Sequence, residues 1–532
     1  MNLNNIYNFK NSIKHFVNID SVIFPEDISN FDKIEIDRSY PIDFRIRKQG
    51  DKYRLLKLPN ILNFRRAYEE FKTLEHFGCI QNMDIDYKRL SANTDTGDFV
   101  EGEYEKQLEE DFERLSVYDN MIKIDIKECY GRIYTHYLDL GREKENFLTN
   151  MNRGATNGLI MGNYISLYFA ELYLTKISND LKRELSSSID SEYDFSYFSD
   201  DFYFFCNKEN NKKIINIFDK VLEKYQLERN DSKEEIWTYE SFNNYNMVAR
   251  YWKKVIAHSN TRFKKYTDET NTEIRKNNKL YFINQLVYRM SKLQDEKLKK
   301  VFINNFFKTK FFRELDLDKY KIKNYDYHQL CFLFKTSPEC LLYSIDKFLE
   351  LDGFDKNKIK KFFTVRYKES LKEPFNDEQL YYYYAIKILG FNDVLGETTN
   401  LVISSDNQIL ISYYLKEKLF SNEEIELLNQ RTDEKYWFQN YHLILYTDNL
   451  KRDLENSIKK YLIPSIIEGI TKLAKKELKM KRYFEFYKDN LSNGIELINS
   501  IYEVNESIED YLELKIEESE ANFQKYARIL NF

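Results

Sequence analysis

The sequence predicts an α+β protein, with a ferredoxin-like βαββαβ unit in its first part and an all-α region after it. Nine of the 14 glycines lie before Asn163, and none lies between Gly162 and Gly353, so tight turns are concentrated in the first part. There, apolar runs of strand and helix type follow one another in the order strand, helix, two strands, helix, strand. We expect two domains, 1–245 and 246–532.

The elements of the βαββαβ unit follow from hydrophobic periodicity. Strand-like runs occupy residues 121–126, 195–198, 202–206 and 236–239. One helix begins near Asn163 and another follows Asn207, each with apolar residues on one face. Two helices packed on one face of an antiparallel sheet are therefore expected.

The second domain shows helical patterns throughout. Leu280, Ile283, Val287 and Met290 form one apolar stripe, and the tyrosine-rich run 381–390 is typical of a buried helix. Helix stops at Gly353 and Gly390 are 37 residues apart, near the period of HEAT-type repeats. HEAT-like stacked helices are the favoured architecture, and a single irregular bundle is the alternative.

Composition places the chain among globular proteins. Hydrophobic residues make up 42% and charged residues 32%, and the 43 tyrosines and 40 phenylalanines are most simply explained by an AT-rich genome. The five cysteines are scattered without a Cys-x-x-Cys pair, which indicates neither a zinc site nor a disulfide framework. Without a signal peptide or a long apolar run, the chain is expected to be a cytoplasmic protein with no membrane contact.

The charge is unevenly distributed. A net charge of −6 disfavours binding of long nucleic acid over the entire surface. Between Arg45 and Lys72, however, nine basic residues stand against three acidic ones. A local basic patch is therefore expected.

The stretch "SYFSDDFYFF" places Asp200 and Asp201 side by side in an apolar, strand-forming run. They form either the exposed tip of a tight hairpin or part of a cation site, since burying either unpaired would be costly. Asp125 lies in another strand-like run, "IKIDI". If the two strands are neighbours, the carboxylates converge at one sheet edge and form an oxygen-rich site for Mg²⁺, as in two-metal phosphoryl transfer.

A third piece, "GLIMGNYIS" at 158–166, has two glycines four residues apart before a helix. Each piece alone is weak evidence, because an S-D-D turn between strands is most often only a turn. In this order and spacing, however, "DIKECY", "GLIMGNYIS" and "FSDD" together resemble the palm of reverse transcriptases.

The resemblance implies roles for the residues of the palm. Asp125, the backbone carbonyl of Ile126, Asp200 and Asp201 would hold the metal ions, and Tyr130 would be the steric gate beneath the sugar of the incoming dNTP. Gly158, Gly162 and Ser166 would let the backbone approach the nucleotide and the primer end. Phe198 stands where the family usually has tyrosine, which removes a hydroxyl but leaves the carboxylates unchanged.

Two further segments carry basic residues with implied roles. "ERNDSKEE" resembles the motif in which Lys233 would protonate the departing pyrophosphate. "KQGDKYRLLKLPN" resembles the fingers, with Lys52, Arg54 and Lys57 available to bind the triphosphate. For all four residues, an ordinary solvated surface charge is an equally good explanation.

A narrower resemblance links the chain to bacterial abortive-infection reverse transcriptases, the AbiK-like group. It is carried by "YGRIYTHYLDL", "GNYISLYFAELYL" and "KLPNILNF", followed by a long helical C-terminal part. The resemblance covers about residues 45–240. It implies antiphage defence, homo-oligomers and a polymerase that uses Mg²⁺, or Mn²⁺, to add dNTPs without a template from a protein tyrosine. The product would be single-stranded DNA attached to the protein, and a phage-derived trigger would start its synthesis.

The priming tyrosine is not fixed by these motifs. Tyr7 is the first candidate, because its N-terminal segment has polar neighbours and a mobile character, and Tyr40 and Tyr53 follow. The simpler interpretation of Tyr7 is a packing residue.

Two other functions remain open at this point. The chain could be an RNA-templated reverse transcriptase of another bacterial defence class, or a palm without chemistry that serves with the helical domain as a scaffold. The presence of Asp125, Tyr130, Asp200 and Asp201 together disfavours the scaffold.

Overall fold

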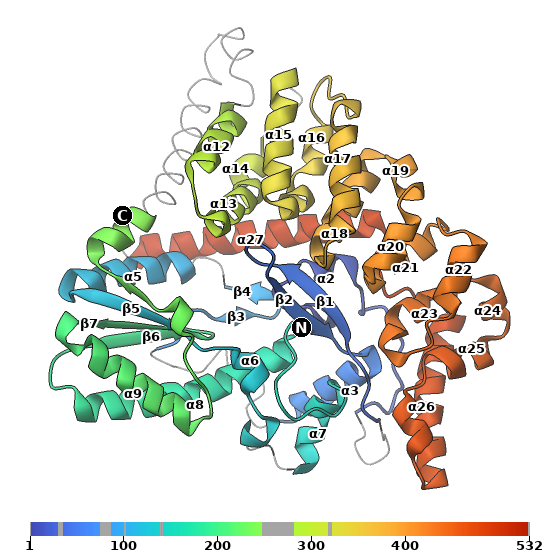
Figure 1. The fold of residues 1–532 in the computed structure, drawn as a ribbon, viewed down its shortest axis with the longest axis horizontal. Helices are drawn as coiled ribbons and strands as arrows, with labels where there is room; N and C mark the ends of the chain where they lie inside the picture. Colours follow the sequence, from blue (N-terminus) through green and yellow to red (C-terminus); the bar gives the residue numbers. More distant parts are fainter. Residues whose placement is uncertain are drawn as a thin grey trace.

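The computed structural model describes residues 2–29, 36–74, 87–100, 103–138, 140, 142–246, 281–315, 317 and 322–529. A four-stranded sheet and its helices lie on one side of the molecule, and the two-stranded β1–β2 hairpin lies near its centre (Figure 1). The C-terminal helices form an arc around that hairpin, and the long helix α27 runs beneath the arc (Figure 1).

The four-stranded sheet has the order β6-β7-β5-β8, and every neighbouring pair is antiparallel. Its strands are β5 (Asn120–Asp125), β6 (Asp194–Phe198), β7 (Asp201–Cys206) and β8 (Glu235–Trp237), all at the predicted places. The crossover helices α8 (Tyr164–Ser188) and α9 (Asn211–Lys224) pack against each other. This order is that of a ferredoxin-like βαββαβ unit, so the predicted fold class is confirmed.

The sheet is buried on both faces. Ile122, Ile124, Phe202 and Phe204 are fully buried in the core that includes α8 and α9, where the Phe202 and Phe218 rings lie 5.1 Å apart. Residues of the opposite parity, such as Met121 and Phe205, form a second cluster with α5 (Glu103–Val117). This alternation explains why the strands carry almost continuous apolar runs.

The remaining elements of the first part support this sheet. They are α1 (Leu3–Tyr7), α2 (Ile13–Phe16), β1 (Ile42–Arg47), β2 (Tyr53–Leu58), α3 (Ile61–Lys72), β3 (Ala92–Asn93), β4 (Asp98–Phe99), α6 (Cys129–Arg132), η1 (Thr135–Leu138), α7 (Arg142–Asn150), η2 (Lys208–Asn210) and η3 (Asp231–Lys233). β1 pairs with β2, and β3 pairs with β4, each as an antiparallel hairpin.

The described residues after 280 form helices joined by short connections, as predicted. Its helices are α12 (Tyr281–Lys292), α13 (Glu296–Lys308), α14 (Lys310–Arg313), α15 (Asn324–Thr336), η5 (Pro338–Tyr343), α16 (Ile345–Leu349), α17 (Asn357–Ser370), α18 (Asn376–Leu389), α19 (Asn392–Gly396), α20 (Thr399–Ser405), α21 (Gln408–Lys416), α22 (Asn422–Asn429), η6 (Glu434–Tyr436), α23 (Trp437–Tyr446), α24 (Asp448–Arg452), α25 (Leu454–Tyr461), η7 (Ser465–Gly469), α26 (Leu473–Ser492) and α27 (Ile501–Ile529). Neighbours along the chain pack together, for example α15 with α17, α17 with α18, and α21 with α23.

The tyrosine-rich run and the helix stop at Gly390 were predicted from the sequence, and both lie in α18 or at its end. The tyrosines of 381–384 are buried in α18, and Gly390 ends that helix with φ 72°. Leu280 lies outside the described residues, as does the segment 247–280 beside the predicted domain boundary. The HEAT-type repeat and the boundary stay predictions.

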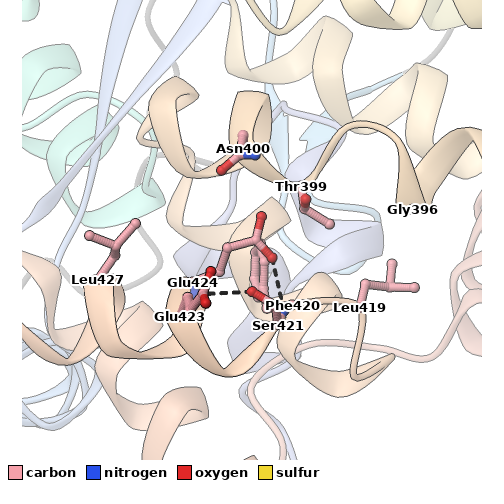
Figure 2. A pocket seen from close by; sticks show the side chains of 9 residues that line it. All are labelled: Gly396, Thr399, Asn400, Leu419, Phe420, Ser421, Glu423, Glu424 and Leu427. Atoms are coloured by element: carbon pink, nitrogen blue, oxygen red, sulfur yellow. Dashed lines mark hydrogen bonds between the residues drawn. The ribbon is translucent and has the colours of Figure 1, made fainter.

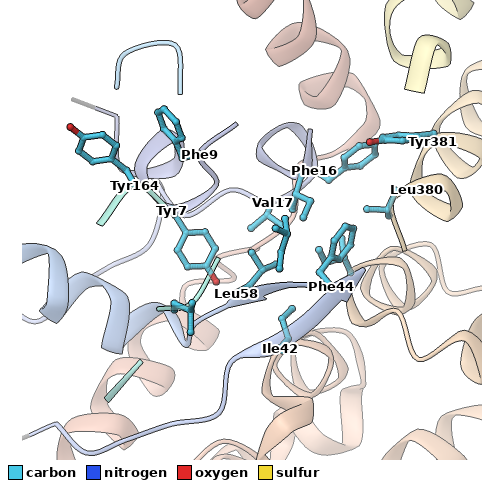
Figure 3. Close-up of a cluster of buried hydrophobic side chains, with 14 of the residues drawn as sticks. Tyr7, Phe9, Phe16, Val17, Ile42, Phe44, Leu58, Tyr164, Leu380 and Tyr381 are labelled. Carbon is cyan, nitrogen blue, oxygen red and sulfur yellow. The ribbon is translucent and has the colours of Figure 1, made fainter. Parts of the chain in front are cut away.

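The N-terminal segment packs into the interior. Phe16 and Val17 lie between the β1–β2 hairpin and α18, beside Phe44 and Tyr381 (Figure 3). Ser12 Oγ and the Tyr381 hydroxyl are 2.5 Å apart, which joins the segment to the helical part.

Two simpler expectations concern cysteines and membranes. Cys129, Cys206, Cys331 and Cys340 are free thiols, whereas Cys79 lies outside the described residues. Over the described part of the chain, the structure has no helix with the length and apolarity that crossing a membrane requires.

Candidate active site

Asp200 lies at the tip of the β6–β7 hairpin. Phe198 pairs with Asp201 across the hairpin, so Ser199 and Asp200 form a two-residue turn. Ser199 has φ 52°, because the turns that match strand twist need a positive φ at their first central residue. The hairpin therefore presents Asp200 at its tip and Asp201 at the first position of β7.

Asp125 ends the neighbouring strand at the same level. It is the register partner of Asp201, and the Ile126 amide donates to the Asp200 carbonyl over 2.9 Å. The three aspartates that were predicted to converge thus lie at one edge of the sheet. The charges at the hairpin tip are part of a carboxylate site rather than an isolated exposed turn.

The Asp125 carboxylate is buried and has two side-chain donors. Its Oδ1 accepts from Asn230 Nδ2 at 3.0 Å, and its Oδ2 accepts from Lys233 Nζ at 2.6 Å. The Asn230 amide also donates to the Asp125 carbonyl at 2.7 Å. The structure thus brings Lys233 to the site, as predicted, and adds Asn230, which sequence reasoning missed although it lies in the same "ERNDSKEE" motif.

Asp201 is held differently. Its Oδ2 lies 3.4 Å from Lys123 Nζ. Burial raises the pKa of Asp201, and the nearby charges of Asp200 and Asp125 raise it further, while Lys123 acts in the opposite direction. Carboxylate oxygens are the ligands that divalent cations such as Mg²⁺ prefer, and three carboxylates lie at this edge.

Carboxylates are the type of ligand that Mg²⁺ prefers, but in this structure two of the three are paired with lysine side chains. Within the described residues, no three His, Cys, Asp or Glu side chains are gathered into a ready metal cluster. Lys233 and Lys123 instead neutralise Asp125 and Asp201. Asp125, Asp200 and Asp201 are the residues that would hold the metal, together with the Ile126 carbonyl next in the chain.

Tyr130 lies just after this edge, in the short helix α6. Its ring is partly buried against the main core, and its backbone carbonyl accepts from the Leu159 amide at 2.7 Å. Burial raises the pKa of Tyr130 well above its ordinary value, and the hydroxyl of Ser199 in the hairpin turn lowers it. The predicted steric gate is therefore adjacent to the β6–β7 hairpin and carries a neutral hydroxyl.

The glycine loop fits tightly between the palm and the fingers. A Cβ on Gly158, which has φ 86°, would lie 3.0 Å from the Gly131 carbonyl oxygen. A Cβ on Gly162 would lie 3.4 Å from Leu56 Cβ of β2, and the Lys57 amide donates to the Met161 carbonyl at 3.0 Å. Gly158 thus allows a close approach to α6, whereas at Gly162 the φ of 121°, and not lack of space, favours glycine.

Ser166 sits in the first turn of α8 and is buried. Its amide donates to the N-cap side chain of Asn163 at 2.9 Å. Among the described residues its hydroxyl has no hydrogen-bond partner. A direct role of Ser166 and Gly162 in nucleotide binding stays a prediction.

The β1–β2 hairpin is the predicted fingers element, and its basic residues differ in position. Lys52 and Arg54 are exposed. Lys57 is partly buried, and its Nζ donates at 3.2 Å to Oδ1 of Asn152, which follows α7, so this amine is bonded within the protein.

Lys48 is a further basic residue of this hairpin that sequence reasoning did not single out. Burial lowers its pKa, as do Arg54 and Lys233, while Asp200 and Asp125 act in the opposite direction. Lys48 therefore lies close enough to Asp200 and Asp125 for their charges to act on it. Its position in the same basic run was the available signal.

Tyr7 lies in the core and not at the site. It is 0% exposed, its hydroxyl donates to the Pro59 carbonyl at 2.6 Å, and burial raises its pKa well above the ordinary value (Figure 3). The expectation of a mobile N-terminal segment is wrong, because α1 is packed against α8 and the fingers. Tyr40 is partly buried, with the Arg153 guanidinium 4.1 Å from its ring centre, and Tyr53 is 45% exposed on β2.

A cavity of about 520 Å³ lies elsewhere, in the helical part (Figure 2). Its lining includes Thr399, Asn400, Phe420 and Leu427. Ser421 and Glu424 at its wall satisfy each other in a capping box. No residue predicted for the active site lines this cavity.

Comparisons with known proteins bear on the first part of the chain. Residues 46–285 match the family model described as reverse transcriptase (RNA-dependent DNA polymerase). A search of curated proteins finds no match.

Two solved structures show similarity to a larger share of the chain. Telomerase from Candida albicans in complex with the TWJ fragment of telomeric RNA is 11% identical, with a TM-score of 0.28, over 79% of this chain and 67% of that one. Apo telomerase from Candida tropicalis is 13% identical, with a TM-score of 0.28, over 74% of this chain and 69% of that one.

The matched segment contains the carboxylate edge, the glycine loop, β2 and Lys233. The geometry and the family model therefore point to the same part of the chain: residues 46–285, which match the reverse transcriptase model, contain the edge where the three aspartates meet.

Proposed function

We propose that the chain is a DNA polymerase of the reverse-transcriptase type that joins dNTPs by two-metal-ion nucleotidyl transfer. The observation that carries this proposal is the meeting of Asp125, Asp200 and Asp201 at one sheet edge, within reach of the cationic fingers hairpin. A carboxylate cluster opposite a set of cations is suited to a substrate with both metal-binding phosphates and excess negative charge.

Each group has a place in the reaction. The attacking hydroxyl oxygen forms a bond to the α-phosphorus of the dNTP, the bond to the bridging oxygen of the β-phosphate breaks, and pyrophosphate leaves. Mg²⁺, or Mn²⁺, bound by the three aspartates and the Ile126 carbonyl would favour deprotonation of that hydroxyl and stabilise the charge that develops on the leaving oxygen. Lys233, whose Nζ donates to Asp125 Oδ2 over 2.6 Å, would give its proton to the pyrophosphate.

The chain's other residues orient the substrate. Lys48, Lys52 and Arg54 of the fingers neutralise the triphosphate. Tyr130, beside the hairpin turn, crowds the 2′ position of the sugar and so favours dNTPs.

We further propose that the polymerase acts in antiphage abortive infection, without a template, and from a protein tyrosine. The motif contexts around Tyr130 and α8 support this, as does the long helical part that follows the palm. The product would be single-stranded DNA attached to the chain, the active form would be a homo-oligomer, and a phage-derived trigger would start synthesis. Tyr53 is the most exposed of the three candidate primers, whereas Tyr7 would have to leave the core first.

The family model itself favours a second candidate, an RNA-templated reverse transcriptase, because its description is that of an RNA-dependent DNA polymerase. A scaffold without chemistry is the third. It would leave the convergence of three mutually repelling carboxylates unexplained.

The test is an incubation of the purified protein with Mg²⁺ and labelled dNTPs, without template or primer, followed by a denaturing gel after nuclease or protease. Label that stays on the protein, grows with time and is released by protease would support protein-primed synthesis. Synthesis only on an added RNA and primer would support the second candidate. The variant Asp200→Asn/Asp201→Asn should abolish synthesis while leaving the fold nearly unchanged, and activity in that variant would overturn the site.

A further inference from the structure

Exposed basic residues lie near the carboxylate edge, and some of them belong to parts of the chain outside the segment that matches the reverse transcriptase model. Lys48 and Arg54 belong to the fingers, Lys10 to the N-terminal segment and Lys297 to α13, and all four are exposed. Within the described residues, none of the four has an ion pair, whereas Lys299 and Lys300 of α13 are paired with Glu296 and Glu378. Unpaired cations gathered in this way imply an anionic partner.

Lys10 is held in an unfavourable conformation beside the catalytic hairpin. Its φ is 56°, in the left-handed region that favours glycine and asparagine, and its amide donates to the Gly97 carbonyl at 2.7 Å. Its Nζ lies 4.3 Å from the Phe99 ring centre and 5.2 Å from that of Phe198, the residue just before the Ser199–Asp200 turn. The amine thus lies near two aromatic rings beside the hairpin and, among the described residues, has no carboxylate partner, so it can meet an anion there.

Three cations and one carboxylate act on the amine of Lys10. Desolvation by the surrounding protein, together with Arg54, Lys515 and Lys297, lowers the pKa of Lys10 to about 8, while Asp98 acts in the opposite direction. The amine is still mostly protonated at neutral pH. Lys515 Nζ donates a hydrogen bond to the Phe99 carbonyl at 2.8 Å. Lys10, Arg54 and Lys297 are therefore the three cations of this group that can bind an anion.

Lys297 reaches this region because the start of α13 lies against the fingers. Lys300 Nζ, one turn further along, donates to the Lys48 carbonyl at 3.4 Å. Lys297 itself is exposed, with its amide bonded to the N-cap Asp295. The N-terminal segment and the helical part thus contribute one cation each beside the fingers.

The cations divide by the charges that act on them. Lys48 is influenced by Asp125 and Asp200, as a triphosphate-binding group should be. The groups that influence Lys10 are instead Asp98, Arg54, Lys515 and Lys297, and its Nζ lies 5.2 Å from the ring centre of Phe198, the register partner of Asp201. A polyanion that begins at the carboxylates and continues outward would meet Lys10 and Lys297 next.

We propose that Lys10 and Lys297 bind backbone phosphates of the DNA strand that is being extended. This inference rests on the proposed polymerase function and names the residues outside 46–285 that hold its strand. Cations that track a phosphate backbone bind single strands without sequence preference and with a strong salt dependence. The fingers would hold the incoming triphosphate, and the N-terminal segment and α13 would hold the growing strand.

The test measures strand binding without chemistry. The full chain is titrated into a fluorescent oligothymidylate of about 12 nucleotides, without dNTPs, and the dissociation constant is measured between about 50 and 200 mM salt. Lys10→Asn is the main variant, because asparagine tolerates φ 56° and the fold should keep its melting temperature. Lys297→Gln tests the second cation, and Lys299→Gln, two residues along α13, is the matched control.

Each lost phosphate contact should lower the slope of log K against log salt by about 0.7 and weaken binding several-fold at low salt. Lys10→Asn and Lys297→Gln should each show this change, the double variant should show about twice the slope change, and Lys299→Gln should bind like the parent. Lys10→Arg should retain binding. Parent-like binding and slope in both single variants, equal loss in Lys299→Gln, or no binding by the parent would overturn the proposal.

The polymerase function can fail independently of this inference. A parent protein that binds the oligonucleotide through Lys10 but incorporates no dNTP in the gel assay contradicts the proposed chemistry and not the strand site. A protein that incorporates dNTPs while Lys10→Asn and Lys297→Gln leave binding unchanged contradicts only the strand site.

Discussion

The Lys233–Asp125 contact joins an exposed lysine to a buried carboxylate. Lys233 is 54% exposed, whereas Asp125 is 8% exposed and keeps a second donor in Asn230. Loss of the lysine therefore leaves the aspartate hydrogen-bonded and in place. This separation allows the chemistry of Lys233 to be tested with little damage to the fold.

We expect Lys233→Ala to lower kcat by about 10²- to 10⁴-fold with little change in the KM for dNTP, because a general acid acts only in the transition state. Lys233→Arg keeps the positive charge but cannot release a proton at neutral pH, so it should be nearly as impaired. Steady-state incorporation kinetics measure both. Lys127→Ala, which removes an exposed partner of Glu228, is the control, and a defect confined to KM would contradict the role.

Gly158 and Gly131 form a matched pair of residues in contact. Gly158 has φ 86°, and a Cβ there would meet the Gly131 backbone, whereas a Cβ on Gly131 would meet nothing within 4 Å. We expect Gly158→Ala to destabilise the protein by roughly 1–2 kcal/mol from the left-handed conformation alone, with more from the contact. Gly131→Ala, in α6, should be neutral or stabilising. Urea unfolding of both variants measures the difference, and equal effects would show that the loop has room to relax.

At the scale of elements, the helical part completes the fingers hairpin. One edge of β1 pairs with β2, and its other edge meets the start of α18. The Arg45 amide donates to Asn376 Oδ1 at 2.8 Å, and the Arg47 amide donates to the Asp377 carboxylate at 3.2 Å. The Arg47 guanidinium is 3.0 Å from Glu378. An otherwise open strand edge is thus closed by helix side chains.

This junction makes the stability depend on pH. Burial raises the pKa of Asp377 from 3.8 to about 7, with a further contribution from Glu378. Because the folded state binds this proton more tightly, its contribution to stability is complete below about pH 4 and is lost as the pH rises through about 7. We expect Asp377→Asn, which keeps an acceptor for the Arg47 amide, to remove this loss.

The measurement is chemical unfolding of the parent and of Asp377→Asn between pH 4 and pH 8. The two proteins should be similar at the acidic end, and the variant should be more stable at the alkaline end by up to roughly 4 kcal/mol, the equivalent of the shift. Parallel profiles across this range would contradict the assignment. Asn422→Asp, at the exposed start of α22, should leave the profile unchanged.

The elements that periodicity could predict were long ones. β5, β7, α8 and α9 carry enough apolar positions to define their faces, and their order fixes the palm. The short α1 and the two-residue strands β3 and β4 have too few positions for a period, which is why Tyr7 was assigned to a mobile segment. Asp125, Asp200 and Asp201 were predictable because they interrupt apolar strands. Lys48 and Asn230 lie in motifs that the sequence singles out, but their contacts, like those of Lys10, become visible only when separate segments meet in space.

At the scale of the whole molecule, the N-terminal segment lies between the two predicted domains. Phe16 is fully buried, and its carbonyl accepts from the Tyr413 hydroxyl and from the Asn499 amide, each at 3.0 Å. His15 Nδ1 is 2.9 Å from Ser507 Oγ of α27. A single apolar cluster includes residues of the palm, of this segment and of the helical part. We therefore expect the two parts to unfold together.

Two tryptophans allow this expectation to be tested in the full chain. Trp237 lies in β8 of the palm and Trp437 in α23, so replacing the other tryptophans gives one fluorescent reporter for each part. Their denaturant midpoints should coincide. Phe16→Ala should destabilise both by about 3–5 kcal/mol, because the cavity opens where the parts meet. Separate midpoints, or a Phe16→Ala shift seen by one reporter alone, would show that the palm and the helical part unfold independently.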